Sequence, residues 1–423
     1  MIWLLLLAML LFLVGVHEGG HFLAAKLLGV AVEEFALGFG PVLFSRKKGE
    51  TRYSIRLLPL GGFVRLAGEE GLTSDVPFER TYYGRPAWVR LLVSLAGPLA
   101  NIVLAGVLAT CAILGFGLPR VQVAGLIPGE PAEQALRVGD VVLEIGGKDI
   151  WLWDDVGPAI QAMAPGPVSF EIVRDGERLQ VDVTPKWHPD EERYLVGAYF
   201  TPQVYLAKLT ELAPNSPLAQ AGLKAGDLIT AACGRKVQTL FELYDALADD
   251  CREVTVLRGG EAITVSLPAR SPEEFLQGAG FAALPQVVER PGPGTAVALA
   301  SRQLARFFVA LAEVVRGLVR GTIPAGEAVA GPVGMAGLLS QGIQAGGLAT
   351  LFLIAFISLN LALFNLIPFP ALDGARMAFA LFEIVSRRKV SPAVEAAIHA
   401  LGFVLLLGLL LLITYRDIMR LFG

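Results

Sequence analysis

Long uninterrupted apolar stretches divide the chain into segments that fit a lipid bilayer and segments that do not. A membrane-spanning helix needs about 20 predominantly apolar residues. Four stretches meet this requirement, and they predict transmembrane helices at residues 1–28, 91–116, 347–375 and 396–415. The pattern therefore predicts a polytopic α-helical membrane protein with about four spans.

The segment between the second and third predicted spans is more polar and contains a weak internal repeat. PGEPAEQALRVGD (128–140) resembles PNSPLAQAGLKAGD (214–227), and each copy continues into an apolar strand, a helix-like stretch and a closing strand. A Gly-Asp turn that opens such a unit is typical of PDZ domains. The repeat thus predicts two β-rich PDZ-like domains, at 120–200 and 203–285. PDZ domains bind extended peptides at a sheet edge, and a purely steric or structural role is the alternative.

A third pattern follows the repeat and has the period of a helix. The charged side chains between 296 and 320 recur at spacings of 4, 7, 3 and 4, which places them on one helical face. They are Arg302, Arg306, Glu313, Arg316 and Arg320. Such a basic amphipathic helix is predicted to lie on the membrane surface, with an ordinary globular helix as the alternative.

The distribution of basic residues predicts the orientation of these spans. Nine lysines and arginines lie between residues 46 and 90, and three more are at 387–389. Short loops rich in Lys and Arg stay in the cytoplasm, so the N-terminus, the PDZ-like domains and the C-terminus are expected outside. Arg416 and Arg420 oppose this weakly.

Overall composition agrees with a membrane protein that has sizeable aqueous parts. The chain has 423 residues, of which 54% are hydrophobic and 17% charged, and its net charge of −4 gives no sign of nucleic-acid binding. The three cysteines form no CxxC pair. Cys233 and Cys251 both fall in the second repeat, where they are either a disulfide or two unpaired buried thiols.

The first predicted span contains the sequence VHEGGH, which combines metal-binding and acid–base side chains. His17 and His21 lie one helical turn apart on one face, so both imidazoles can bind one zinc ion. Glu18 beside them can act as base on a water that the metal activates. Ionisable residues are costly inside a membrane and usually mark function. Gly19 and Gly20 leave room for either a substrate backbone or a packed helix.

A catalytic zinc site needs three protein ligands and one open position. Asp373 is the preferred third ligand, because it follows 45 uncharged residues and is framed by Pro368 and Pro370. Prolines break helices, and broken backbone at membrane depth is tolerated only inside protein or along a cavity. His399 is a second intramembrane possibility, whereas His188 is expected on the surface of the soluble region.

Taken together, these motifs resemble one known family. HEGGH, SLAGPLANIV, the tandem repeat and FNLIPFPALDG are similar to the bacterial site-2 proteases, and in particular to regulator-of-sigma-factor intramembrane metalloproteases with two PDZ domains. The resemblance implies that His17, His21 and Asp373 bind one Zn²⁺ per chain and that Glu18 is the general base. It also implies that Asn365 helps to position the substrate.

The resemblance further implies a membrane-reentrant β-hairpin at residues 31–70. The alternation of Tyr53 and Ile55 with polar neighbours supports a strand there. An exposed edge of this hairpin, carrying Tyr53 and Ile55, is expected to pair with an unwound substrate helix.

For the whole protein, the resemblance implies cleavage inside the transmembrane segment of single-pass proteins, such as an anti-sigma factor already trimmed on its outer side. The expected location is the bacterial cytoplasmic membrane, in contact with lipid, with PDZ-like domains that filter substrates by size or read the trimmed end. Removal of signal-peptide remnants is an alternative within the same chemistry. A non-catalytic PDZ receptor and a metal transporter are alternatives outside it.

Overall fold

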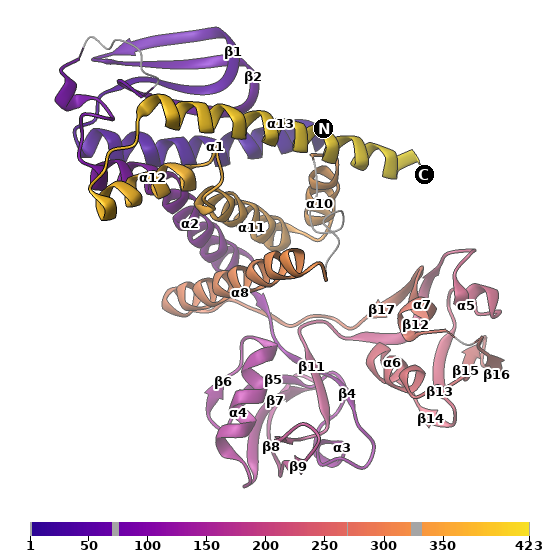
Figure 1. Ribbon diagram of the computed structural model, residues 1–423. Helices are drawn as coiled ribbons and strands as arrows, with labels where there is room; N and C mark the ends of the chain where they lie inside the picture. Colours follow the sequence, from indigo (N-terminus) through magenta and orange to yellow (C-terminus); the bar gives the residue numbers. More distant parts are fainter. Residues whose placement is uncertain (1, 70–75, 269, 323–331, 423) are drawn as a thin grey trace. The chain divides into compact units, whose positions relative to one another are not determined.

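The computed structural model describes residues 2–69, 76–268, 270–322 and 332–422. It divides into two compact units, a helical unit formed by Met1–Phe116 with Pro291–Gly423 and a β-rich unit formed by Gly117–Arg290 (Figure 1). Met1 and residue 70, at the ends of two predicted segments, lie outside the described residues. The β-rich unit is thus an insertion into the sequence of the helical one.

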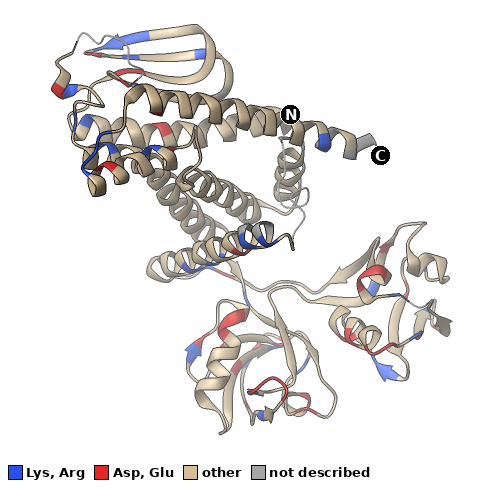
Figure 2. Ribbon diagram, viewed as in Figure 1, with Lys and Arg blue, Asp and Glu red and all other residues tan. Residues whose placement is uncertain are grey.

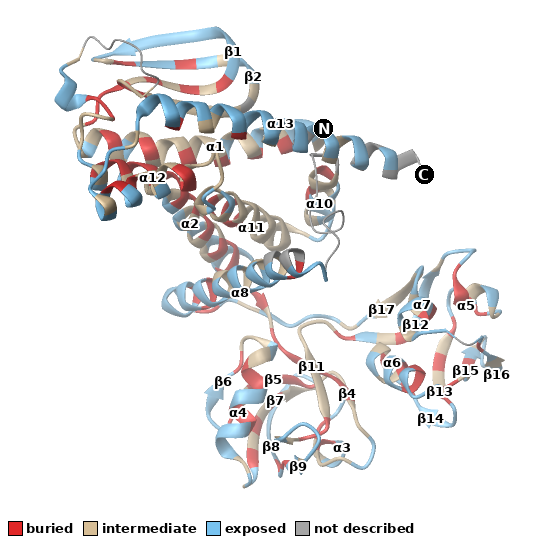
Figure 3. Ribbon diagram, in the orientation of Figure 1, coloured by how far each residue is buried: buried red, intermediate tan, exposed pale blue. Residues whose placement is uncertain are grey.

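The helical unit is built from long apolar helices and one small sheet. The helices are α1 (Ile2–Leu27), α2 (Ala87–Phe116), α8 (Pro293–Arg320), α10 (Pro332–Gln344), α11 (Gly347–Leu366), α12 (Asp373–Ser386) and α13 (Pro392–Phe422), with a short 3₁₀ turn at Phe78–Arg80. Buried Leu6, Met9 and Leu13 of α1 pack against Ala336 and Leu339 of α10, with partly buried residues of α11 around them. Many apolar side chains of α13 face outward (Figure 3), as a lipid-facing helix requires.

Five helices among the described residues are long and apolar enough to cross a membrane. Four of them, α1, α2, α11 and α13, correspond to the four predicted spans. The fifth candidate is Pro293–Val314 within α8, the segment for which a surface helix is predicted. Length and composition do not separate a spanning helix from an interfacial one, so the surface placement of 296–320 stays a prediction.

The helix break predicted from Pro368 and Pro370 is present. α11 ends at Leu366, α12 begins at Asp373, and Ala371 between them has a positive φ of 75°. Gly374 is required in this turn, because a Cβ there would lie 2.1 Å from the carbonyl oxygen of Ile367. The tight turn makes Asp373 the first residue of α12.

The predicted hairpin is more elaborate than two strands. β1 (Val32–Lys48) and β2 (Thr51–Leu66) are long and bent, so that the first part of β2 pairs with both halves of β1 and its last part pairs with the first half of β1. Phe35 lies opposite both Val64 and Tyr53, while Arg46 also lies opposite Tyr53. The segment around Tyr53 is therefore paired on both sides, and Gly62–Leu66 is at an edge of the sheet.

The β-rich unit contains the two copies of the sequence repeat. The sheet of the first copy has the order β11-β4-β5-β7-β8, and the sheet of the second has the order β16-β15-β13-β12-β17. The first copy comprises β4 (Gln122–Leu126), α3 (Ala132–Ala135), β5 (Val141–Ile145), β6 (Lys148–Asp149), α4 (Val156–Met163), β7 (Val168–Arg174), β8 (Glu177–Val183), β9 (Lys186–His188), β10 (Arg193–Leu195) and β11 (Ala198–Thr201). The second comprises β12 (Tyr205–Leu212), α5 (Pro217–Gln220), β13 (Leu228–Ala232), β14 (Arg235–Lys236), α6 (Leu240–Ala248), β15 (Glu253–Arg258), β16 (Glu261–Ser266), α7 (Pro272–Leu276) and β17 (Ala279–Ala283). The first and last strands of the unit, β3 (Leu118–Pro119) and β18 (Val288–Glu289), pair with each other.

The Gly-Asp turns of the repeat perform the same structural task in both copies. The carboxylate of Asp140 accepts hydrogen bonds from Arg174 at the end of β7, and that of Asp227 accepts them from Arg258 at the end of β15. Each pair joins the turn to the end of a closing strand. In the second copy Cys233 and Cys251 form a disulfide, which decides between the two alternatives that the sequence leaves open.

Candidate metal centre

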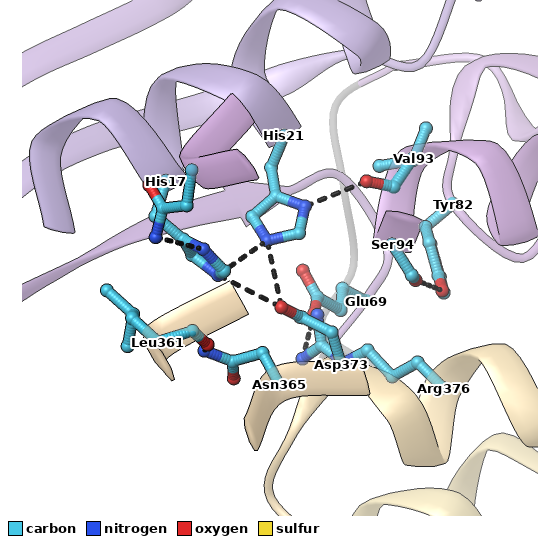
Figure 4. A network of polar contacts seen from close by, with 11 residues as sticks. His17, His21, Glu69, Tyr82, Val93, Ser94, Leu361, Asn365, Asp373 and Arg376 are labelled. Atoms are coloured by element: carbon cyan, nitrogen blue, oxygen red, sulfur yellow. Dashed lines mark hydrogen bonds and ion pairs between the residues drawn. The ribbon is translucent and has the colours of Figure 1, made fainter. Parts of the chain in front are cut away.

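The break between α11 and α12 brings Asp373 against the two histidines of α1 (Figure 4). Oδ2 of Asp373 lies 3.0 Å from Nε2 of His17 and 3.2 Å from Nε2 of His21, and the two Nε2 atoms are 3.3 Å apart. One ligand atom from each residue lies within 4.8 Å of the others. Three donors that converge in this way, two imidazoles and a carboxylate, match the set that catalytic zinc uses.

His21 is held so that only its Nε2 faces this cluster. Its Nδ1 donates a hydrogen bond of 2.8 Å to the carbonyl oxygen of Val93 in α2. Gly97 leaves space for the ring, since a Cβ there would lie 2.2 Å from Nε2 of His21. A backbone acceptor on the second ring nitrogen fixes the tautomer that a metal ligand needs.

His17 has a comparable support that sequence reasoning did not identify. Its Nδ1 lies 3.4 Å from the side-chain amide of Asn101, whose amide oxygen is buried without a partner among the described residues. The oxygen and nitrogen of an amide are interchangeable by a half-turn. With the oxygen toward His17, Asn101 accepts from Nδ1–H and leaves Nε2 for a metal. The sequence signal that could have identified Asn101 is a single amide side chain within an otherwise apolar span.

A cavity of about 260 Å³ opens beside the three side chains and is also lined by Glu18. Asn365 lines it as well, although its amide nitrogen donates to Leu361 in its own helix at 2.9 Å. Arg376, one turn after Asp373, reaches the same cavity and forms an ion pair with Glu69. The predicted base is therefore in the cavity, and the contact of Asn365 with a substrate stays a prediction.

The two glycines of the motif differ in their surroundings. A Cβ at Gly20 would lie 2.4 Å from the carbonyl oxygen of Ala96, so this glycine permits close packing of α1 against α2. A Cβ at Gly19 would meet nothing within 4 Å. The structure thus assigns helix packing to Gly20 and leaves open space at Gly19.

The other two histidines have different contacts. Nδ1 of His399 accepts a hydrogen bond of 3.0 Å from the backbone N–H of Ala371, so this side chain supports the turn that carries Asp373. His188 pairs with Glu130 at 3.2 Å in the first PDZ-like domain. Neither belongs to the cluster.

The strand next to the cavity is the edge segment of β2 and not the segment that the sequence indicated. Phe63 and Val64 line the cavity, and a Cβ at Gly62 would lie 3.3 Å from Cγ of Glu18. Tyr53 and Ile55 are not among the lining residues, and their backbones are already paired on both sides. The expectation of an open edge at Tyr53 and Ile55 is therefore corrected to Gly62–Leu66. The alternation of side chains predicted a strand but could not show where the strand bends.

Comparison with known proteins agrees with this arrangement. The family model for peptidase family M50 matches residues 5–409. A protein of Thermotoga maritima, provisionally named a zinc metalloprotease, is 30% identical over 96% of this chain and 97% of its own length. The zinc metalloproteases RasP of Oceanobacillus iheyensis and Geobacillus kaustophilus are each 29% identical over 97% of this chain.

Among solved structures, a local likeness to this chain is found for the PDZ domain of an SdrC-like protein from Listeria monocytogenes, at 18% identity over 20% of this chain and 88% of that one. Its TM-score of 0.19 is too low to support an argument.

The family match spans nearly the whole chain, and the convergent His–His–Asp cluster with a glutamate in its cavity gives that match a chemical basis. The chain belongs to peptidase family M50 and is a multi-pass zinc metalloprotease of the site-2 type.

Proposed function

We propose that this protein hydrolyses a peptide bond within the transmembrane segment of single-pass membrane proteins, with one zinc ion held by His17, His21 and Asp373. The observation that carries the proposal is the convergence of these three side chains between the apolar helix α1 and the first residue of α12. The donor set fits zinc, because Nδ1 of His21 is occupied by the carbonyl of Val93 and its Nε2 is left for a metal. A zinc ion there would supply Lewis-acid activation of water and of the scissile carbonyl.

Glu18 is the group that moves the proton in this proposal. It follows His17 directly in α1 and lines the same cavity, so a water beside the ligands lies within its reach. As general base, its carboxylate takes a proton from the attacking water and then gives it to the leaving amine. Charged and polar groups act more strongly in such a poorly hydrated place than in bulk water.

The edge of β2 provides a place for an extended substrate. Gly62–Leu66 pairs on one side with the first half of β1, and its other side has no strand partner among the described residues. A substrate helix that unwinds could add a strand there. Phe63 and Val64 would then bring its carbonyl groups to the cavity that contains Glu18.

The experiment that tests this function is a Glu18→Ala variant, with cleavage of a single-pass membrane protein and bound zinc both measured. Because Glu18 is base and not ligand, cleavage should be abolished while zinc content stays near that of the wild type. Equal loss of zinc and cleavage would contradict the assigned role. Full cleavage by Glu18→Ala would refute a protease site at this cavity.

For the natural substrates, we propose single-pass proteins already trimmed outside the membrane, such as an anti-sigma factor. Comparison of membrane proteomes from cells with the wild type and with Glu18→Ala would reveal the fragments that accumulate. Removal of signal-peptide remnants would use the same site and would give short fragments in that comparison. A non-catalytic receptor would leave the two proteomes alike.

We further propose that the PDZ-like pair faces the outside of a bacterial cytoplasmic membrane and restricts substrate access. The equivalent strands β11 and β17 both lie at the end of their sheets, where a peptide end could be added. Deleting 124–283 should then permit cleavage of untrimmed substrates, and loss of all cleavage in a folded protein would contradict a restricting role. Asn215, which is exposed, is suited to a cysteine-labelling test of orientation in intact cells.

A further inference from the structure

A second cavity lies at the end of the helical unit where α2 begins and α12 ends. Its volume is about 330 Å³, and it shares no lining residue with the cavity of the metal centre. Five of its side chains are basic and one is acidic, namely Arg85, Arg90, Arg387, Arg388, Lys389 and Glu383. Figure 2 shows this concentration of lysine and arginine in the turn between α12 and α13. The cavity thus carries a strong excess of positive charge.

The single acid of this cavity is already engaged. Glu383 forms a buried ion pair with Arg90 and also accepts a hydrogen bond of 2.9 Å from the backbone N–H of Val390. Arg387, Arg388 and Lys389 are exposed, and the ion pairs of the described chain include none of them. Nε of Arg90 is buried and has no acceptor in the described part of the protein. The exposed positive charges of Arg387, Arg388 and Lys389 are therefore available to a ligand.

The surroundings of the cavity are those of a membrane interface. Trp88, at the start of α2, is 53% exposed, and tryptophan is enriched where lipid headgroups meet water. On α12, Phe382 and Val385 are 52% and 83% exposed. Exposed apolar side chains that lie within a few residues of a basic cavity in the sequence suit a molecule with acyl chains and an anionic headgroup.

We propose that this basic cavity, lined by Arg85, Arg90, Arg387, Arg388 and Lys389, binds the headgroup of an anionic phospholipid. Arginine side chains pair with phosphate oxygens through two parallel hydrogen bonds. The first N–H groups of α2, beside Pro86 and Ala87, add a partial positive charge at the same place. The acyl chains would lie along the exposed apolar face of α12. This binding is separate from proteolysis and does not depend on the zinc site.

The experiment titrates the purified full-length protein in detergent with phosphatidylglycerol and with phosphatidylcholine and counts bound lipids by native mass spectrometry. The test variant is Arg387→Gln/Arg388→Gln/Lys389→Gln. Each lost charge should weaken binding roughly fivefold, so the triple variant should bind phosphatidylglycerol on the order of 100-fold more weakly. The matched control is Arg46→Gln/Lys47→Gln/Lys48→Gln, which removes three consecutive exposed charges from the β-hairpin and should bind like the wild type.

Three results would overturn the proposal. The first is a wild type that binds both lipids equally, which would mean that the cavity does not select an anion. The second is an equal loss of phosphatidylglycerol binding in both triple variants, which would indicate general charge attraction. The third is displacement of phosphatidylglycerol by an excess of inorganic phosphate, which would make the site a free-phosphate site. Unchanged circular dichroism of both variants controls for folding.

Discussion

Gly97 provides a direct test of the metal centre, because its only contribution is the absence of a side chain. In Gly97→Ala the new Cβ would lie 2.2 Å from Nε2, 2.6 Å from Cε1 and 2.8 Å from Cδ2 of His21. Ordinary contact begins at 3.4 Å, so the ring must move by about 1.2 Å. The ring cannot easily move away from Gly97, because its Nδ1 is hydrogen-bonded to the carbonyl oxygen of Val93 in the same helix α2.

The size of the effect follows from what that movement disturbs. A shift of about 1.2 Å exceeds the tolerance of roughly 0.2 Å on metal–ligand distances. Loss of an outer support of a ligand typically lowers metal affinity about 10- to 100-fold. Because Gly97→Ala displaces the ligand itself, we expect zinc affinity to fall by at least this factor and cleavage to fall in parallel.

The assay measures bound zinc in the purified protein at a series of buffered free-zinc concentrations, together with cleavage of a single-pass substrate. Gly106→Ala is the matched control, since it makes the same substitution in the same helix. Its new Cβ would meet only Leu304, at an ordinary 3.7 Å. Both changes raise helix propensity by about 1 kcal/mol, so a difference between them isolates the clash with His21. Normal zinc binding by Gly97→Ala would refute His21 as a ligand in this geometry.

Three further predictions concern residues around and beyond the site. Asp373→Asn should nearly eliminate cleavage and lower zinc affinity by more than the roughly 10- to 100-fold that an outer partner of a ligand contributes. His399→Ala should keep zinc, because His399 only supports the backbone of Ala371. Zinc loss in His399→Ala with zinc retained in Asp373→Asn would exchange their roles. Asn101→Leu should weaken zinc binding about 10- to 100-fold by releasing Nδ1 of His17, and unchanged affinity in a zinc titration would show that the amide does not orient this ring. In the second PDZ-like domain, the hydrogen bond from Arg258 holds the pKa of Asp227 below its usual value, so this pair stabilises the domain above about pH 4 and loses that contribution as pH falls through the lowered pKa. The protection of the turn at 222–228 against hydrogen exchange, taken relative to the intrinsic rate at each pH, should therefore fall in acid in the wild type but much less in Asp227→Asn, and identical acid responses would contradict the prediction.

The sequence by itself was sufficient for the features that are local or periodic. Apolar stretches of bilayer length predicted the four helices α1, α2, α11 and α13, because length and hydrophobicity are properties of consecutive residues. The i, i+4 spacing placed His17 and His21 on one helical face, and the prolines predicted the interruption before Asp373. The repeat predicted two similar β-rich domains, and the structure shows the same Asp–Arg pair in each.

Only the tertiary structure decided which distant residues meet. His17 and Asp373 are 356 positions apart, and His399 was an equally intramembrane alternative until its hydrogen bond to Ala371 placed it behind the turn. The supports at Val93 and Gly97 were hidden in an apolar span, because a carbonyl group or a missing Cβ leaves no mark in a hydrophobic pattern. Asn101 was visible as a lone amide in that span, but its contact with His17 was not. The open strand edge at Gly62–Leu66 was likewise hidden, since alternation along a strand is the same whether its neighbours are paired or free. Local periodicity thus specified the elements, and long-range packing specified the site, because burial and hydrogen bonding depend on partners that are remote in the chain.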